Sequence, residues 1–210
     1  MNAELKKIEV WLRQRGETPR SYRDLSKNVK GDSLVPEDLT TEAYNYDAVV
    51  GSFYANKTLH RCCSCDALLL KEHLYLIEFK SSGDDVSIFG LDLSKLSQTQ
   101  LKKIGNVLYK VESKLSESLY MLKNWILPAV TGLVDECRFE KHAIVVFNAD
   151  ENAASANAAS RASASGQKCE PAKKLYPRFQ EKTADGKPVF YHTVSVWPEN
   201  LFSAKIRAVP

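Results

Sequence analysis

The chain has 210 residues, of which 44% are hydrophobic and 26% charged, and its formal net charge is +3. This length and composition are typical of one globular domain with a sizeable core. A mildly basic chain is compatible with nucleic acid but differs from a polycation that binds DNA by charge alone. The first residues lack the apolar core of a signal peptide, and no segment has the roughly 18 apolar residues of a membrane helix. We therefore expect a cytoplasmic protein with no membrane partner.

The N-terminal third predicts two helices, a connecting loop and a strand. Apolar residues repeat at helical spacing from Leu5 to Leu12 before Gly16, which predicts an amphipathic helix packed on the main domain. Residues 17–36 mix charges with turn formers and predict a loop. A proline followed by acids predicts a helix start over residues 36–44. Residues 52–59 predict a first strand.

Residues 65–80 predict a β-hairpin that brings two carboxylates and a lysine together. Side chains on a strand alternate between faces, so Glu78 and Lys80 project from the same face. If residues 71–73 form a three-residue loop, Asp66 lies directly opposite Glu78. A loop of two or four residues would place Asp66 on the other face, so this pairing depends on the loop length.

Two carboxylates that face each other across a hairpin repel, so the pair needs a compensating cation. Lys80 or a bound metal ion could supply that charge. The runs around the charges are apolar on both faces, as in a strand covered on both sides, where an ion is rarely buried unless it is paired or metal-bound. The alternative is that Asp66, Glu78 and Lys80 emerge at a solvated edge and form an ordinary surface salt bridge.

The segment 96–127 predicts a long helix or two shorter ones, because its apolar residues repeat in threes and fours before Pro128 ends it. Lys114 and Ser118 interrupt an otherwise apolar row of this helix. They could face the carboxylates and contact phosphate or a metal-bound water, or the lysine could extend to solvent. Residues 142–147 then predict a short buried strand after a crossover helix.

The C-terminal part begins with residues 149–168, whose alanine, serine and asparagine content predicts a flexible loop. Basic and aromatic residues follow in a pattern typical of phosphate and base contacts, or of a solvated loop with two aromatic anchors. Its candidate phosphate-binding residues are Lys173, Lys174 and Arg178. The alternation over residues 189–197 predicts an added strand.

The cysteines allow a zinc hypothesis that their spacing does not favour. Cys62, Cys63 and Cys65 lie close in sequence, and the further ligands would come from Cys137, Cys169, His60 or His73. Structural zinc sites usually contain two pairs with two to four intervening residues, and the chain has no two such pairs. Free thiols in a reducing compartment are the interpretation that we favour.

An aspartate, a hydrophobic hairpin and Glu78-Phe79-Lys80 together resemble the motif of the PD-(D/E)xK nuclease superfamily. Cys65 stands where the family name has proline, a position that varies widely. The resemblance covers roughly residues 37–147 and implies an α/β protein with a restriction-endonuclease-like αβββαβ core and a mixed sheet. The predicted order of helix, three strands, helix and strand agrees with that core. We expect one domain over 1–210, with an N-terminal helix, an added C-terminal strand and a C-terminal extension over 169–210.

The resemblance also implies a metal-dependent nuclease that uses Mg²⁺ or Mn²⁺. In that superfamily the residues matching Asp66 and Glu78 hold the metal, and the lysine matching Lys80 orients the attacking water and stabilises the phosphate. Many members place a further acid on the preceding helix, for which Glu42 is the candidate by position, with Asp47 behind it. The alternative is an inactive module of this fold that binds nucleic acid or a protein partner. The choice between DNA and RNA, and a homodimer, stay open.

Overall fold

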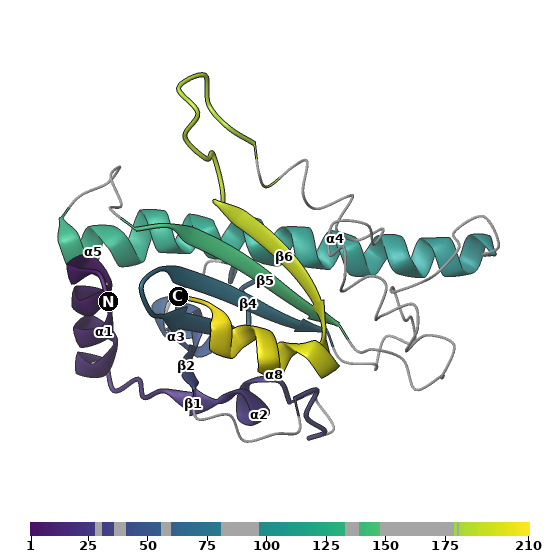
Figure 1. Cartoon of the computed structure of the whole chain (residues 1–210), viewed down its shortest axis with the longest axis horizontal. Coiled ribbons are helices and arrows are strands. Elements are labelled where there is room, and N and C mark those ends of the chain that lie inside the picture. The colour runs from purple at the N-terminus through teal and green to yellow at the C-terminus, as the bar shows by residue number, and fades with distance from the viewer. Residues whose placement is uncertain are drawn as a thin grey trace.

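The computed structural model describes residues 1–27, 31–35, 41–55, 60–80, 97–132, 139–147, 179 and 181–210. Within these ranges six strands form one mixed sheet in chain order, from β1 to β6 (Figure 1). The antiparallel part consists of β1 (Arg20–Ser21), β2 (Glu42–Asn45), β3 (Ala67–Leu70) and β4 (Leu74–Lys80). The parallel part adds β5 (Lys141–Phe147) and β6 (Thr193–Pro198) beside β4. The expected α/β class with a mixed sheet is confirmed.

Helices cover both faces of this sheet. They are α1 (Ala3–Gln14), α2 (Tyr22–Leu25), α3 (Tyr46–Tyr54), α4 (Gln98–Met121), α5 (Leu127–Thr131) and α8 (Glu199–Ala208), with one π-helical turn at Leu122–Ile126 between α4 and α5. Parallel neighbours need a crossover connection, and α4 and α5 lie in the one between β4 and β5. In Figure 1 the long helix α4 crosses behind the sheet and α8 lies in front of it.

Alternation along the strands divides the buried residues into two cores, one on each face. Leu74 and Leu76 of β4 belong to the core that contains buried residues of α1, α3 and α4. Tyr75 and Ile77 belong to the opposite core, with buried residues of α2 and α8. Because side chains two apart share a face, the face that α4 covers is also the one onto which Glu78 projects.

The N-terminal helix and the long helix were predicted, but the end of the long helix was not. Asn2 caps α1 by accepting a hydrogen bond from Glu4 N, and Gly16 follows with a φ of 80°. The helical path does not stop at Pro128, because the π-helical turn precedes it and the proline lies in the first turn of α5. It ends instead at Gly132, whose φ is 69°.

Three predictions for the N-terminal third were wrong. Residues 17–36, predicted as a loop, contain β1 and α2. Glu42 belongs to strand β2, and not to a helix over residues 36–44. Its neighbours Ala43 and Tyr44 are buried in opposite cores, which is the alternation of a strand and not the periodicity of a helix. The strand predicted at 52–59 overlaps the end of α3 at 52–54, and residues 56–59 lie outside the described ranges.

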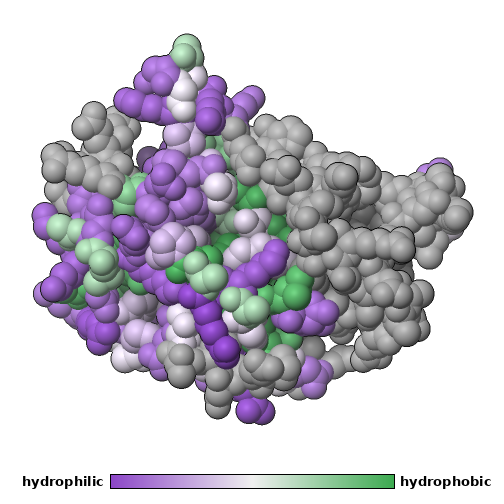
Figure 2. All heavy atoms as spheres, viewed as in Figure 1, coloured by the Kyte–Doolittle hydropathy of each residue, from purple (hydrophilic) through white to green (hydrophobic). Residues whose placement is uncertain are grey.

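At the other end of the chain, the predicted strand begins later than expected and a helix follows it. Strand β6 starts at Thr193, whereas residues 189–192 have no strand pairing, and α8 was not predicted. Phe202 and Ile206 of α8 are both fully buried against the sheet. On the face seen in Figure 2, hydrophilic side chains cover much of the described surface. Among the described residues, no helix is long and apolar enough to cross a membrane.

Candidate active site

The hairpin of β3 and β4 has the three-residue loop on which the sequence argument depended. Leu70 pairs with Leu74, and Ala67 pairs with Ile77. The backbone N–H of Asp66, one residue before β3, donates to the carbonyl of Ile77 over 3.0 Å. Continued by one residue, this register would set Asp66 opposite Glu78, but the N–H of Asp66 bonds one residue earlier on β4. The two carboxylates are close together, because Nζ of Lys114 contacts both.

Glu78 is the most deeply buried charged residue of this site, with no exposed area at all. Its Oε1 lies 2.7 Å from Nζ of Lys80 and 2.9 Å from Nζ of Lys114. Its Oε2 accepts no hydrogen bond from any residue that the structure describes. A buried carboxylate oxygen without a donor costs free energy, so this atom marks a place where a cation would be stabilising.

Lys114 joins the two carboxylates from helix α4. Its Nζ lies 3.2 Å from Oδ1 of Asp66 as well as 2.9 Å from Glu78, and only 26% of its side chain is exposed. Of the two alternatives open from the sequence, the structure therefore places the lysine at the carboxylates and not in solvent. Two carboxylates and two ammonium groups make the fully ionised site neutral.

The electrostatics of the site follow from burial and from these contacts. Burial raises the pKa of Glu78 to about 7, the negative charge of Asp66 adds to the rise, and Lys80 and Lys114 oppose it. For Lys114, burial disfavours the ammonium, but Glu78 and Asp66 outweigh burial, so its pKa lies above the ordinary value. Glu78 is consequently a group that exchanges a proton near neutral pH, next to a permanently charged lysine.

Helix α4 also holds the segment that leads into Asp66. The Oγ of Ser118 accepts a 2.7 Å hydrogen bond from the N–H of Cys65, and Oε2 of Glu117 accepts a 2.5 Å bond from the N–H of Cys63. Tyr46 donates its hydroxyl to the carbonyl of Ser118 over 2.8 Å and its N–H to the carbonyl of Asp66 over 3.1 Å. The backbone before Asp66 is thus tied to two helices.

These contacts change the role expected for Ser118. Its side chain is fully buried and its Oγ is bonded to the backbone, so we withdraw it from the candidate phosphate-binding residues. It positions the chain at Asp66. Glu117 and Tyr46, which sequence reasoning missed, do the same. The signal for Ser118 was a polar residue in an apolar helical row, but the sequence carried no such signal for Tyr46.

Glu42 does not join the site. Tyr44 of β2 pairs with Leu68, so the register of this antiparallel pair carries Glu42 toward Leu70 and the hairpin loop, away from Asp66. Its side chain is exposed. The assignment of Glu42 as a metal ligand rested on a helix that does not exist there, and we do not retain it.

Asp47, the second acid considered, lies nearer to the site. It is in the first turn of α3, where Oδ1 accepts a 2.6 Å hydrogen bond from Ser64 and Oδ2 forms a 2.6 Å ion pair with Arg61. Both of its oxygens are therefore engaged. The other candidate phosphate-binding residues, Lys173, Lys174 and Arg178, lie outside the described residues.

The cysteines that are described do not converge on one point. Cys65 is buried, Cys63 is exposed, and Sγ of Cys62 accepts a 3.0 Å hydrogen bond from the Tyr54 hydroxyl. Within the described part of the chain, no group of three metal-ligating side chains includes a cysteine. Cys137 and Cys169 lie outside it.

Comparison with known proteins does not assign the chain to a family. No family model, curated protein or solved structure matches the chain.

Proposed function

We propose that this protein is a metal-dependent nuclease that hydrolyses phosphodiester bonds in DNA or RNA, built on a restriction-endonuclease-like core. The observation that carries the proposal is the register of one hairpin. It brings Asp66 close to Glu78, where one lysine contacts both carboxylates, and Lys80 lies on the same face as Glu78 and contacts it. Two carboxylates and a lysine at the end of a buried strand form the minimal set for binding a metal ion and a phosphate.

The sheet order supports the same fold. Three antiparallel strands, β2 to β4, are followed by the crossover that contains α4 and then by the parallel strand β5. The helix α1 precedes these strands, but β1 and α2 lie between α1 and β2, and α3 lies between β2 and β3, so the support comes from the order of β2 to β5 in the sheet and from the crossover helix.

The residues at the site fit a small divalent cation. Carboxylate oxygens are the ligands that Mg²⁺ and Mn²⁺ prefer, and Oε2 of Glu78 is buried without a donor among the described residues. Asp66 and Glu78 would hold the ion. When bound, such an ion polarises a phosphate and lowers the pKa of a water molecule.

The lysines have separate roles in this proposal. The side chain of Lys80 is 14% exposed and holds its charge at the carboxylates, where it orients a water molecule and offsets negative charge on the phosphate. Lys114 contacts both carboxylates. For a metal to bind, Nζ of Lys114 moves away from Asp66 and becomes available to a phosphate oxygen.

One observation favours a second candidate function, a nuclease-fold module without activity that binds nucleic acid or a protein partner. The two lysines neutralise the two carboxylates without any metal, so the site is stable as a purely structural ion-pair network. A protein that had lost catalysis could keep such a network because it joins α4 to the hairpin.

Cleavage assays separate the two functions. The purified protein is incubated with single-stranded, duplex and branched DNA and with RNA, in Mg²⁺, Mn²⁺ or EDTA. The variants are Lys80→Met and Asp66→Asn, with Lys110→Met, an exposed lysine of α4, as the matched control. The nuclease proposal expects divalent-dependent cleavage that both site variants lose and the control keeps.

Absence of cleavage of every substrate by well-folded protein would refute the nuclease. Salt-dependent nucleic-acid binding that persists in EDTA would then support the binding module. Cleavage that survives in Asp66→Asn would show that another part of the chain, or a contaminant, is responsible.

A further inference from the structure

A second group of ligating side chains lies at the opposite end of strand β4. His73 is in the hairpin loop directly before β4, and Glu140 and His142 are at the start of the neighbouring strand β5. The parallel register pairs Leu74 with Lys141, which brings the three residues together. Glu78 lies five positions after His73, or roughly 16 Å along a strand, so the two groups are distinct.

The ligand atoms of this group are already close to one another. One ligand atom from each of His73, Glu140 and His142 lies within 4.8 Å of the other two. Nε2 of His142 and Oε2 of Glu140 are 3.3 Å apart. A tetrahedral zinc ion with bonds of about 2.0 Å separates its ligands by about 3.3 Å. The His142–Glu140 pair therefore has the spacing of two ligands on one ion.

One ring nitrogen of each histidine in the group makes no hydrogen bond with the described residues, which points to a ligand. His142 is only 8% exposed, and the contact of its Nε2 is with Oε2 of Glu140, which offers a neutral imidazole a hydrogen bond in one tautomer alone. Nδ1 of His73 is likewise buried and unbonded within the described part of the chain. Two buried ring nitrogens without a hydrogen bond beside one carboxylate are unusual in an ordinary core, where buried polar groups are hydrogen-bonded.

The other ring nitrogen of His142, Nδ1, makes the kind of hydrogen bond that orients metal-binding histidines. Nδ1 lies 2.8 Å from Oγ1 of Thr193, a contact that fixes the ring and leaves Nε2 directed at Glu140. The ring also stacks on Tyr75, with centroids 4.9 Å apart. Burial lowers the pKa of His142 to about 4, although the negative charge of Glu140 acts to raise it. The imidazole is therefore neutral at pH 7 and can donate a lone pair to a metal.

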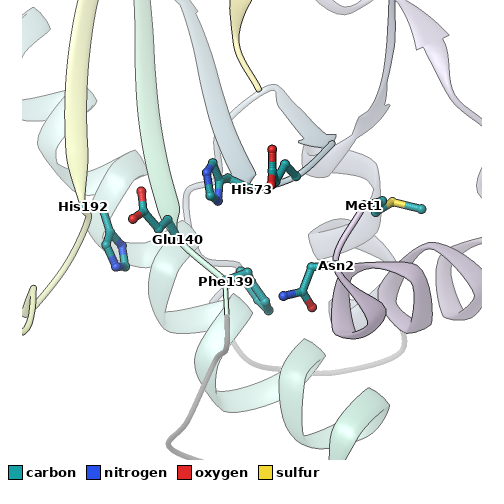
Figure 3. A pocket seen from close by; sticks show the side chains of 7 residues that line it. Met1, Asn2, His73, Phe139, Glu140 and His192 are labelled. Carbon is teal, nitrogen blue, oxygen red and sulfur yellow. The ribbon is translucent and has the colours of Figure 1, made fainter.

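The group is accessible to an ion from solvent. His73 and Glu140 line an open pocket of about 580 Å³ together with His192, and Figure 3 shows these side chains around it. His192 is held beside the group, since its Nδ1 accepts a 3.1 Å hydrogen bond from the N–H of Lys141. All three proposed ligands, His142 included, line a second open pocket of about 240 Å³. Three protein ligands in an open pocket leave a coordination position for water or another small ligand.

We propose that His73, Glu140 and His142 form a binding site for Zn²⁺ or a similar transition metal. Imidazole ligands suit zinc and disfavour Mg²⁺, so this site and the carboxylate site differ in the metals they take. The ion would join the hairpin loop to β5. The proposal does not depend on the nuclease activity, because it rests on different residues at the other end of the sheet.

Metal titration of untagged, chelator-stripped protein tests the site. Zn²⁺ binding is followed by calorimetry, Co²⁺ binding by its visible absorption, and folding by circular dichroism. The variants are His73→Gln, Glu140→Gln and His142→Gln. The matched controls are His60→Gln and Glu181→Gln, which change an exposed histidine and an exposed glutamate elsewhere. Cys63→Ser tests the exposed thiol as a competing ligand.

We expect one zinc equivalent whose affinity falls about tenfold or more in each of the three variants and stays unchanged in the controls. Zinc should also raise the unfolding midpoint of the wild type, because it binds the folded state. Absence of zinc binding by folded wild-type protein would overturn the proposal. So would unchanged affinity in His73→Gln and Glu140→Gln, or a cobalt spectrum with a thiolate charge-transfer band that Cys63→Ser abolishes. If His142→Gln fails to fold, the other two variants decide.

Discussion

The backbone N–H of Phe79 donates a 2.7 Å hydrogen bond to Oδ2 of Asp66. This bond fixes the aspartate side chain across the hairpin, beside Glu78. Its second oxygen, Oδ1, is left for Lys114 at 3.2 Å. Asp66 therefore has one oxygen with a structural task and one that faces the charges of the site, and substitutions can separate the two tasks.

Asp66→Asn should keep most of the stability and lose the proposed binding of Mg²⁺. The amide oxygen of asparagine can still accept from Phe79, whereas Asp66→Ala removes the acceptor and should cost a further 1–2 kcal/mol, roughly, in the free energy of unfolding. Urea denaturation in EDTA measures the stability, and Mg²⁺ titration measures the metal site. Equal stability of the two variants would mean that the bond to Phe79 contributes little.

Lys114→Met should make the folded protein depend more strongly on divalent metal. Without this ammonium, Asp66 and Glu78 repel each other with only Lys80 to compensate, so the unfolding midpoint in EDTA should fall. Mg²⁺ then competes with Lys80 alone, and the rise in the midpoint on adding it should exceed that of the wild type. Thermal unfolding in EDTA and in Mg²⁺ checks this.

The control for this prediction is Lys110→Met, which removes an exposed lysine from the same helix. It should leave both midpoints close to those of the wild type. A rise with Mg²⁺ that is no larger in Lys114→Met than in Lys110→Met would count against a metal at these carboxylates.

The buried Glu78 should make stability fall as pH rises. Its pKa is about 7 in the folded chain against an ordinary value of 4.5, so between these pH values the folded state holds a proton that the unfolded state has released. Stability contributed by the protonated form is present below pH 4.5 and is lost as pH rises through 7. Glu78→Gln removes this loss, worth roughly 3 kcal/mol for a shift of this size.

The measurement is the free energy of unfolding of both proteins in EDTA, from pH 4 to pH 8. His142, whose pKa is lowered, has the opposite pH dependence, but it is common to both proteins and cancels in their difference. The free energy of unfolding of Glu78→Gln, minus that of the wild type, should therefore increase as pH rises. A difference that is constant with pH would show that Glu78 titrates at an ordinary value.

Ser118→Ala should lower stability without a matching loss of phosphate binding. The substitution leaves the N–H of Cys65 without its 2.7 Å partner in a buried place, which should cost about 1–3 kcal/mol. Ser116→Ala, two positions earlier on α4, is the control and should cost much less. Urea denaturation measures the first effect, and nucleic-acid affinity under conditions where both variants are folded measures the second. A specific loss of affinity in Ser118→Ala would restore it to the phosphate-binding residues.

The sequence determined those features that follow from local geometry. Alternation along a strand places Glu78 and Lys80 on one face, and the apolar periodicity of α4 predicts a helix whose buried row contains Lys114 and Ser118. These patterns depend only on residues near one another in the chain. Such patterns fail where tertiary pairing overrides a local signal. At Glu42, acids after a proline indicated the start of a helix, but pairing with β1 and β3 makes this segment a strand.

Only the tertiary structure decided which distant residues meet. Lys114 contacts Asp66 across 48 positions because packing fixes where α4 crosses the sheet. His73 meets Glu140 and His142 because the register of β4 against β5 aligns their first residues. A crossover can place its return strand in several registers, and the sequence between the strands does not specify which. The energy that selects one register comes from the packed core as a whole, so no short motif reveals it.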